Sequence, residues 1–282
     1  MENARPKSSL LLASLLAGTL SVWTPMVGAQ GCDSQNFDVE AALQKVWISC
    51  DDRMVYEVGA VAGERAVPAL RKLAATVKVL NKKRRCGALD EALQKTLAKL
   101  GDTPSLQELA LEFNRNGYVP PLAFVGDDHA IAIMMEYFEK HLQDPGVVNR
   151  GGLNGNDVPM HSPLWLIVNG IFLDIGERRS IPNSPFKTKS AWSDDEMKEA
   201  FHAWWEKHEN APIAVPPYES VSDPYLRCLA RKADWGLDWG FDGALLAIAD
   251  RGGDEAKSVL EKFPDSPAKS MALTKLGSAI VP

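Results

Sequence analysis

The residues of this chain best suited to chemistry are its five histidines, at positions 129, 141, 161, 202 and 208. His161 lies in a long loop beside Asp157 and Ser162, and loops often carry catalytic groups. These three residues are therefore the candidate site of a hydrolase. His202 and His208 are six residues apart on one expected helix, about 240° around its axis, so they cannot share a metal ion as an i, i+4 pair does.

Motifs of known catalytic chemistry are missing from the sequence. It contains no Gly-x-Ser-x-Gly, His-Glu-x-x-His or Gly-x-x-x-x-Gly-Lys-Ser/Thr pattern. The paired acids at 51–52, 127–128 and 194–195 precede expected helices, where the helix dipole favours negative charge. We therefore expect no enzyme activity, no metal and no other cofactor.

Tryptophans offer a different kind of site, one for binding. Trp235 and Trp239 lie four residues apart in ADWGLDWGFDG. They are expected either to pack against a neighbouring helix or to stand exposed as anchors for a partner, since tryptophan is enriched in interface hot spots. Trp204 and Trp205 point about 100° apart on one helix, so one is expected in the core and the other nearer the surface. The candidate binding residues are Trp205, Trp235, Trp239 and His161.

Composition places the chain among ordinary globular proteins. Its 282 residues are 45% hydrophobic and 24% charged, with a formal net charge of −6, enough for one or two domains with a sizeable core. The only basic cluster is KKRR at 82–85, expected in a solvated loop. Nucleic acid is therefore not an expected partner.

The N-terminus has the pattern of a secretory signal peptide. A basic start with Arg5 and Lys7 precedes the apolar stretch 9–23, and Val27-Gly28-Ala29 supplies small residues for cleavage. We expect cleavage after Ala29 and a periplasmic or secreted protein that is not integral to the membrane. An uncleaved anchor is the less favoured reading because the stretch is short for a span. A lipoprotein is another, but Gln30 disrupts the small-residue pattern before Cys32.

Four cysteines follow the expected cleavage site, and an even number in an exported chain indicates disulfides. Cys50 and Cys86 each precede a helix expected to be the first of a pair. Successive first helices begin at the same edge of a stack, so this pair is favoured. Cys32 and Cys228 would then join the two ends of the chain. Free buried cysteines are the alternative.

Hydrophobic periodicity predicts an all-α protein. Helices are expected at 37–48, 52–61, 64–79, 88–101, 103–114, 128–142, 163–176 and 197–209, and in the tail at 222–233, 240–250, 254–263 and 266–279. Pro120-Pro121 precede the helix at 128–142. The expected divisions are a signal peptide (1–29), an N-terminal helical-repeat region (30–143), an insertion with long loops and one apolar helix (144–192), and a C-terminal helical region (193–282).

Three stretches share one design. VAGERAVPALRKLAA (61–75), GDDHAIAIMMEYF (126–138) and GGDEAKSVLEKF (252–263) align on Ala66, Ala130 and Ala256. Acids then coincide at Glu64, Asp128 and Asp254, and apolar residues at Leu70, Met134 and Leu260. This pattern resembles the second helix of HEAT-type repeats of the PBS-lyase kind, and DDEMKEAFHAWWEKH (194–208) resembles a tryptophan-rich helix found beside such repeats in bacteria. The resemblance implies stacked antiparallel helix pairs, an α-solenoid.

Two classes of function follow. Stacked helix pairs usually present a surface that binds a protein or peptide, so a non-catalytic scaffold of the bacterial envelope is the leading hypothesis, with a periplasmic inhibitor or immunity-type protein as one version. The alternative is an exported hydrolase with its site in the loop 144–162.

Overall fold

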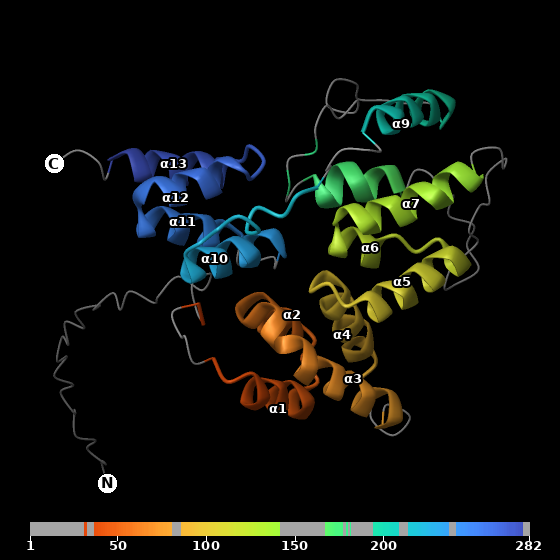
Figure 1. Ribbon diagram of the computed structural model, residues 1–282, viewed down its shortest axis with the longest axis horizontal. Coiled ribbons are helices and arrows are strands. Elements are labelled where there is room, and N and C mark those ends of the chain that lie inside the picture. Colours follow the sequence, from red (N-terminus) through yellow and green to blue (C-terminus); the bar gives the residue numbers. More distant parts are fainter. Residues whose placement is uncertain are drawn as a thin grey trace, which may run out of the picture.

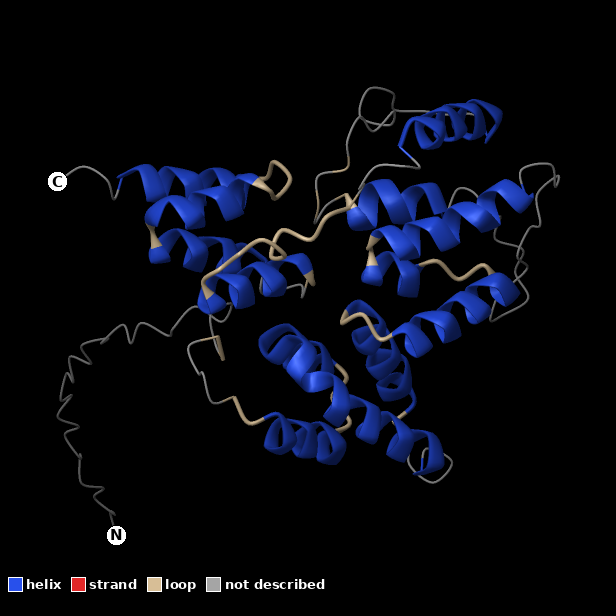
Figure 2. Cartoon of the chain, viewed as in Figure 1, coloured by secondary structure: helices blue, strands red, loops and turns tan. Residues whose placement is uncertain are grey.

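The computed structural model describes residues 31–32, 37–80, 86–141, 167–176, 179, 181, 194–208, 214–236 and 241–278. Within these ranges the chain is helical and has no strand, as the sequence predicts (Figure 2). The first helices are α1 (Val39–Ser49), α2 (Arg53–Ala62), the 3-10 turn η2 (Gly63–Ala66), α3 (Val67–Leu80), α4 (Gly87–Lys99), α5 (Thr103–Asn116), α6 (Pro120–Val125) and α7 (Asp128–His141). They are followed by the π-helical turn η3 (Gly170–Ile175), α9 (Asp194–His208), α10 (Pro224–Asp234), α11 (Phe241–Arg251), α12 (Gly253–Glu261) and α13 (Pro267–Ser278).

Aspartates start several of these helices. The side chains of Asp38, Asp102 and Asp223 each accept a backbone N–H from the first turn of α1, α5 and α10. Helix α6 is the one short helix in the described residues that the sequence did not predict. Pro120 and Pro121 form its first turn, where proline's missing N–H costs no hydrogen bond. The proline pair therefore begins a helix here.

The three aligned stretches have the same local structure. Each stretch contains a glycine with positive φ near the start of its helix: Gly63 (60°) is the first residue of η2, Gly126 (60°) lies two residues before α7, and Gly253 (86°) is the first residue of α12. The aligned alanines and the aligned residues four positions later are completely buried. They are Ala66, Ala130, Ala256, Leu70, Met134 and Leu260. The aligned acids are exposed. The exposed acid and the buried stripe therefore recur in the register of the alignment, whereas the glycine of the second stretch lies one position earlier than the other two.

The helices form a row whose order in space differs from their order in the chain (Figure 1). Helix α2 packs against α4, α4 against α6, and α6 against η3. On its other side α2 packs against α10, which packs against α11, and α11 packs against α13. The C-terminal helices α10, α11 and α13 thus continue the row on the side of α2 that faces away from α4. The contact between α10 and α2 lies at the middle of the row.

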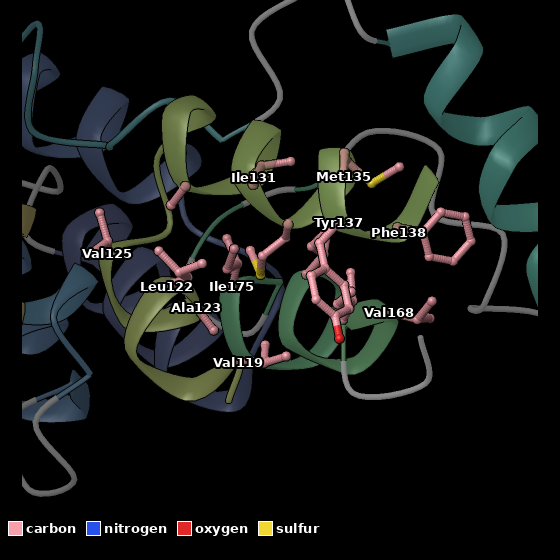
Figure 3. Close-up of a cluster of buried hydrophobic side chains, with 14 of the residues drawn as sticks. Val119, Leu122, Ala123, Val125, Ile131, Met135, Tyr137, Phe138, Val168 and Ile175 are labelled. Atoms are coloured by element: carbon pink, nitrogen blue, oxygen red, sulfur yellow. The ribbon is translucent and has the colours of Figure 1, made fainter. Parts of the chain in front are cut away.

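Three hydrophobic cores lie along the row. One lies among α1 to α4 around Leu70 and Leu93, and another among α10 to α13 around Leu245 and Leu260. The third joins α5, α6 and α7 to η3 and α9 (Figure 3). The apolar helix expected at 163–176 is observed from residue 167, and its Gly170 lies where an added Cβ would come 2.5 Å from Val119 Cγ1. Glycine is needed there for close approach to α6.

Two disulfides link distant parts of the chain. Cys50, at the end of α1, bonds to Cys86, at the start of α4, and Cys32 bonds to Cys228 on α10. This is the pairing favoured by the argument from stacked helix pairs, and none of the four cysteines is free. The described residues include no helix long and apolar enough for a membrane crossing.

Candidate functional site

Aromatic and lysine side chains from four helices meet at the middle of the row. Helix α2 contributes Tyr56, α4 contributes Lys95 and Lys99, α6 contributes Phe124, and α10 contributes Trp235. We call these five residues the aromatic–lysine cluster. The ring centroids of Tyr56 and Phe124 are 5.1 Å apart, and those of Phe124 and Trp235 are 5.8 Å apart. Tyr56 and Phe124 are partly exposed, whereas Trp235 is buried, so the cluster has an accessible upper layer and a buried lower layer.

The register of α4 explains how the two lysines reach this position. Lys95 and Lys99 are one turn apart and therefore share a face of the helix. Leu93 and Leu97 lie on the opposite side of α4 and are buried in the core of α1 to α4. Packing of that apolar stripe fixes the rotation of α4, and this directs both lysines toward the aromatic rings.

Lys95 occupies the accessible layer. Its ammonium nitrogen lies 5.5 Å from the ring centroid of Tyr56 and 5.7 Å from that of Phe124, within cation–π range. It also lies 3.0 Å from a carboxylate oxygen of Glu91, one turn earlier on α4. Burial disfavours the charge on Lys95, but Tyr56 and Glu91 outweigh burial and raise its pKa. Burial also raises the pKa of Tyr56, opposed by Lys95, so the pair is an ammonium beside a neutral phenol.

Lys99 lies in the buried layer, with its side chain 1% exposed. Its Nζ donates to the backbone carbonyl of Phe124 at 2.7 Å, at the C-terminal end of α6, where carbonyls lack helical partners. The same nitrogen lies 3.2 Å from Oδ2 of Asp234 and 4.8 Å from the centroid of the Phe124 ring. Lys99 thus fixes the end of α6 and the position of Phe124.

Asp234 holds a second cation, Arg179. The Asp234 side chain is 0% exposed and accepts two hydrogen bonds from the guanidinium, from Nε at 2.5 Å and from Nη2 at 2.8 Å. Arg179 also donates from Nη1 to the carbonyls of Gly126 and Ala214. Burial opposes the charge of Arg179, and Asp234 outweighs burial and raises the pKa of Arg179. One buried carboxylate therefore faces two buried cations.

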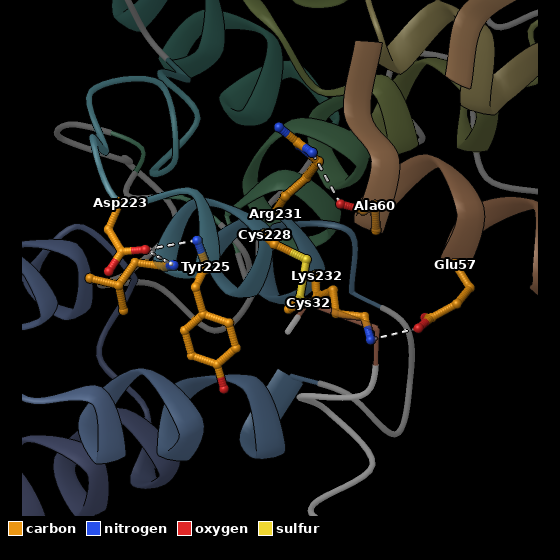
Figure 4. The surroundings of a disulfide bond; sticks show 9 residues. Cys32, Glu57, Ala60, Asp223, Tyr225, Cys228, Arg231 and Lys232 are labelled. Atoms are coloured by element: carbon orange, nitrogen blue, oxygen red, sulfur yellow. Dashed lines mark hydrogen bonds and ion pairs between the residues drawn. A yellow bond between two sulfur atoms is a disulfide. The ribbon is translucent and has the colours of Figure 1, made fainter. Parts of the chain in front are cut away.

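Close packing of α2 against α10 supports the cluster from beneath. An added Cβ at Gly59 would lie 2.6 Å from both Trp235 and Thr96, and one at Gly63 would reach the guanidinium of Arg231. Gly59 on α2 and Gly63 at the C-cap of α2 thus accommodate Trp235 at the C-cap of α10 and Arg231 on α10. The contact is completed by Arg231 donating to the Ala60 carbonyl at 3.1 Å and by an ion pair of Lys232 with Glu57 at 2.5 Å, beside the Cys32–Cys228 disulfide (Figure 4).

The structure shows the surroundings of two of the tryptophans expected to bind a partner, Trp235 and Trp205. Trp235 is 1% exposed and packs in the core, so it is not an exposed anchor. Trp204 is buried and Trp205 is partly buried, which is the division expected for this pair. Trp239 and the loop residues Asp157, His161 and Ser162 lie outside the described residues.

The cluster itself was not found by sequence reasoning. Tyr56, Lys95 and Phe124 come from three separate helices, and Arg179 lies in the insertion expected at 144–192. Its partner Asp234 is 55 residues away in the chain. A usable signal was present in VYEVGAVAG, where Gly59 and Gly63 share one helix face, the spacing that permits close helix approach.

The remaining histidines show no metal site. In the described part of the chain no three histidine, cysteine or acidic side chains are placed to hold a metal ion. The two ring nitrogens of His202 each lie 3.5 Å from a different carboxylate, Glu139 on α7 and Glu206 on α9. A surface pocket of about 520 Å³ adjoins His202 and is lined by Asp195, Lys198, Glu199, His202 and Ala203, none of which is a serine, threonine or cysteine.

The aromatic–lysine cluster is therefore suited to binding. It has two partly exposed rings and an ammonium, all fixed from below by buried contacts. Comparison of the chain with protein-family models, with curated proteins and with solved structures finds no match in any of the three. Function is accordingly inferred from the arrangement of the chain's own residues.

Proposed function

We propose that this protein is a non-catalytic scaffold of HEAT-like helix pairs, exported to the bacterial envelope, that binds a protein partner through the aromatic–lysine cluster. The observation that carries the proposal is the partly exposed Tyr56–Phe124 pair, held in place by Lys99 and Trp235. Tyrosine, phenylalanine and tryptophan are enriched in protein interfaces and dominate their hot spots. Binding sites are most effective when packing has already fixed their side chains.

The other features agree with this role. Three helix pairs whose second helix has the same exposed acid and buried stripe, α2–α3, α6–α7 and α11–α12, support repeat architecture, and repeat scaffolds commonly bind proteins. Two disulfides suit an oxidising compartment such as the periplasm. A periplasmic inhibitor or immunity-type protein is one specific form of this scaffold. No observation among the described residues favours the hydrolase alternative, whose three candidate residues fall outside them.

The test is site-specific crosslinking of the mature, oxidised chain. A photoreactive benzoylphenylalanine at position 56 should capture one discrete protein from a bacterial envelope extract, and excess unlabelled protein should suppress that capture. The same group at position 118 is the control, because Tyr118 is 48% exposed and is not one of the cluster residues. Capture that is equal at both positions would contradict the proposed site.

Alanine substitution then measures the contribution of the ring. Tyr56→Ala should weaken binding of the captured partner by at least ~30-fold, corresponding to the roughly 2 kcal/mol typical of a hot-spot residue. Tyr118→Ala should leave the dissociation constant within about twofold. The dissociation constants are measured by calorimetry, and unchanged affinity in Tyr56→Ala would remove Tyr56 from the interface.

A further inference from the structure

We infer that the Cys50–Cys86 disulfide is redox-active and is opened selectively by an external dithiol, whereas the Cys32–Cys228 disulfide is structural. This inference goes beyond the proposed function and does not rest on it. Exposure does not distinguish the two bonds, because each joins a buried cysteine, Cys86 or Cys228, to a partly exposed one. The bonds differ in the backbone conformation that they hold and in the helix position of their sulfur atoms.

Cys50 has a backbone conformation that disfavours any residue with a Cβ. It ends α1 with φ 55° and ψ 27°, in the left-handed helical region, and it is the only residue other than glycine with positive φ in the described part of the chain. Helices α5 and α6 end in the same conformation at Gly117 and Gly126, where the missing Cβ removes the steric penalty. The bond to Cys86 therefore helps to hold Cys50 in a strained conformation.

Opening the bond removes this restraint on the end of α1. Strained disulfides are reduced more readily than unstrained ones, because reduction lets the strain relax. The other bond holds no such strain, since neither Cys32 nor Cys228 has positive φ and Cys228 lies within the body of α10. Backbone strain therefore favours reduction of the bond at Cys50.

Cys86 occupies a position that favours its departure as a thiolate. It is the N-cap residue of α4, and its side chain makes no capping hydrogen bond in the disulfide form. The first N–H groups of a helix lack helical partners and favour negative charge, so this position stabilises a thiolate. Asp90 in the first turn of α4 opposes the effect, but its charge also acts on Lys78 of α3, which offsets it in part.

Cys228 has cationic neighbours but a less favourable position in its helix. Arg231 and Lys232 lie about one turn later on α10, where Lys232 forms an ion pair with Glu57 at 2.5 Å. The N–H groups of the first turn of α10 already donate to the carboxylate of Asp223. A thiolate at Cys228 would therefore gain less from the start of its helix than one at Cys86.

The reaction is thiol–disulfide exchange. A thiolate of the dithiol attacks the sulfur of Cys50, forms a mixed disulfide with it and releases Cys86 as a thiolate. Attack in this direction is favoured because Asp51 and Asp52 follow Cys50 and disfavour a thiolate there, although Arg53 pairs with Asp51 at 3.1 Å. The second thiolate of the reductant then closes its own disulfide and frees Cys50. The dithiol loses two electrons to the two sulfurs, and its two protons pass to Cys50 and to solvent.

The first experiment follows both bonds in the whole oxidised protein. The protein reacts with 1 mM dithiothreitol at pH 7.5, samples are quenched in acid and alkylated, and peptide mass spectrometry gives the reduced fraction of each bond. Cys50–Cys86 should be reduced at least about tenfold faster than Cys32–Cys228. In 8 M urea, where the fold is lost, the two rates should agree within about threefold. Equal rates in the native protein, or a tenfold difference that persists in urea, would overturn the inference.

Single-thiol variants test the leaving group. The one free thiol is Cys86 in Cys50→Gly and Cys50 in Cys86→Ala, while Cys32–Cys228 stays closed in both. Thiolate absorbance at 240 nm should appear at least about one pH unit lower for Cys86 than for Cys50. Ionisation of both thiols at the same pH, or of Cys50 first, would contradict the assignment of Cys86 as the leaving group.

A pair of double variants tests the strain itself. Cys50→Gly/Cys86→Ala and Cys50→Ala/Cys86→Ala both lack the disulfide and differ only at residue 50. The variant with glycine should unfold at a urea concentration higher by roughly 0.2–0.5 M, because glycine accepts the left-handed conformation that alanine resists. A midpoint that is no higher with glycine would show that residue 50 is unstrained and would overturn the inference.

Discussion

At the scale of single residues, the charges of Lys99, Asp234 and Arg179 are the most demanding feature of this protein. Each would be costly to bury alone, and each is compensated by the others and by backbone carbonyls. The three residues come from α4, from α10 and from the segment after η3, so their mutual attraction fixes three parts of the chain around one carboxylate. Fold stability and the geometry of the aromatic–lysine cluster thus depend on the same atoms.

Asp234→Asn should therefore be severely destabilising. The amide keeps the size of the side chain but leaves Arg179 and Lys99 without their buried counter-charge, which costs about 3–5 kcal/mol of unfolding free energy. Asp250→Asn is the control, because Asp250 pairs with Lys275 at a half-exposed site and should cost less than about 1 kcal/mol. Urea unfolding at pH 7 measures both. A loss below 1 kcal/mol in Asp234→Asn would show that the triad is not needed for stability.

At the scale of elements, the start of α5 combines a cap with a tertiary contact. Asp102 accepts the backbone N–H of Ser105 at 3.0 Å and its hydroxyl at 2.6 Å, and also accepts a hydrogen bond from Arg71 on α3 at 2.5 Å. Burial alone would raise the pKa of Asp102, but these bonds outweigh burial and lower it. The ionised carboxylate therefore holds α3 and α5 together.

Asp102→Ala should lower the unfolding free energy at pH 7 by about 2 kcal/mol, the upper end for loss of a helix cap. Since folding lowers the pKa of Asp102, its contribution is complete above the unfolded value of about 3.9 and disappears as pH falls through the lower folded value. The gap between wild type and variant should therefore shrink as the pH falls below about 4. Urea unfolding at pH 7, 4 and 3 measures this gap.

Asp38→Ala is the matched control for that prediction. Asp38 caps α1 through Ala41 at 3.0 Å in an exposed hydrogen bond, and within the described ranges it has no tertiary ion pair. Its loss should cost only about 0.5–1 kcal/mol. Equal losses in the two variants would mean that the contact with Arg71 adds nothing to the cap.

Most individual helices could be predicted from the sequence, because their causes are local. The buried stripe of Ala66 and Leu70 and the caps of α5 and α10 are all set by residues within one or two turns. Helix α6 was missed because Pro120-Pro121 indicates a break as readily as a helix start. The cluster was missed because nothing local links Tyr56 to Lys95 or Phe124.

At the scale of the whole molecule, the order of helices in the row is what the sequence does not show. Helix α10 packs against α2, although more than 150 residues separate them, and this contact depends on shape at Gly59 and on the buried Asp234. Local periodicity carries no information about such pairing. The predicted pairing of the cysteines did carry information about the order of the helices. The bond between Cys32 and Cys228 joins the start of the described chain to α10, beside the contact of α10 with α2 (Figure 4).

The two disulfides should accordingly contribute unequally to stability. A disulfide stabilises mainly by restricting the unfolded chain, and the restriction grows with the length of the closed loop. The bonded cysteines are 196 residues apart for Cys32–Cys228 and 36 for Cys50–Cys86. The chain-entropy relation makes the longer loop the stronger constraint by about 1.5 kcal/mol.

The paired variants Cys32→Ala/Cys228→Ala and Cys50→Ala/Cys86→Ala test this difference. The first should lose about 5 kcal/mol of unfolding free energy and the second about 4 kcal/mol or less, with urea unfolding of the otherwise oxidised chain as the measurement. The longer loop also closes across the α2–α10 contact, so the first pair should additionally weaken protection from hydrogen exchange in α10 more than in α4. A larger loss in the second pair would mean that local packing around α1 and α4, rather than chain entropy, determines the effect.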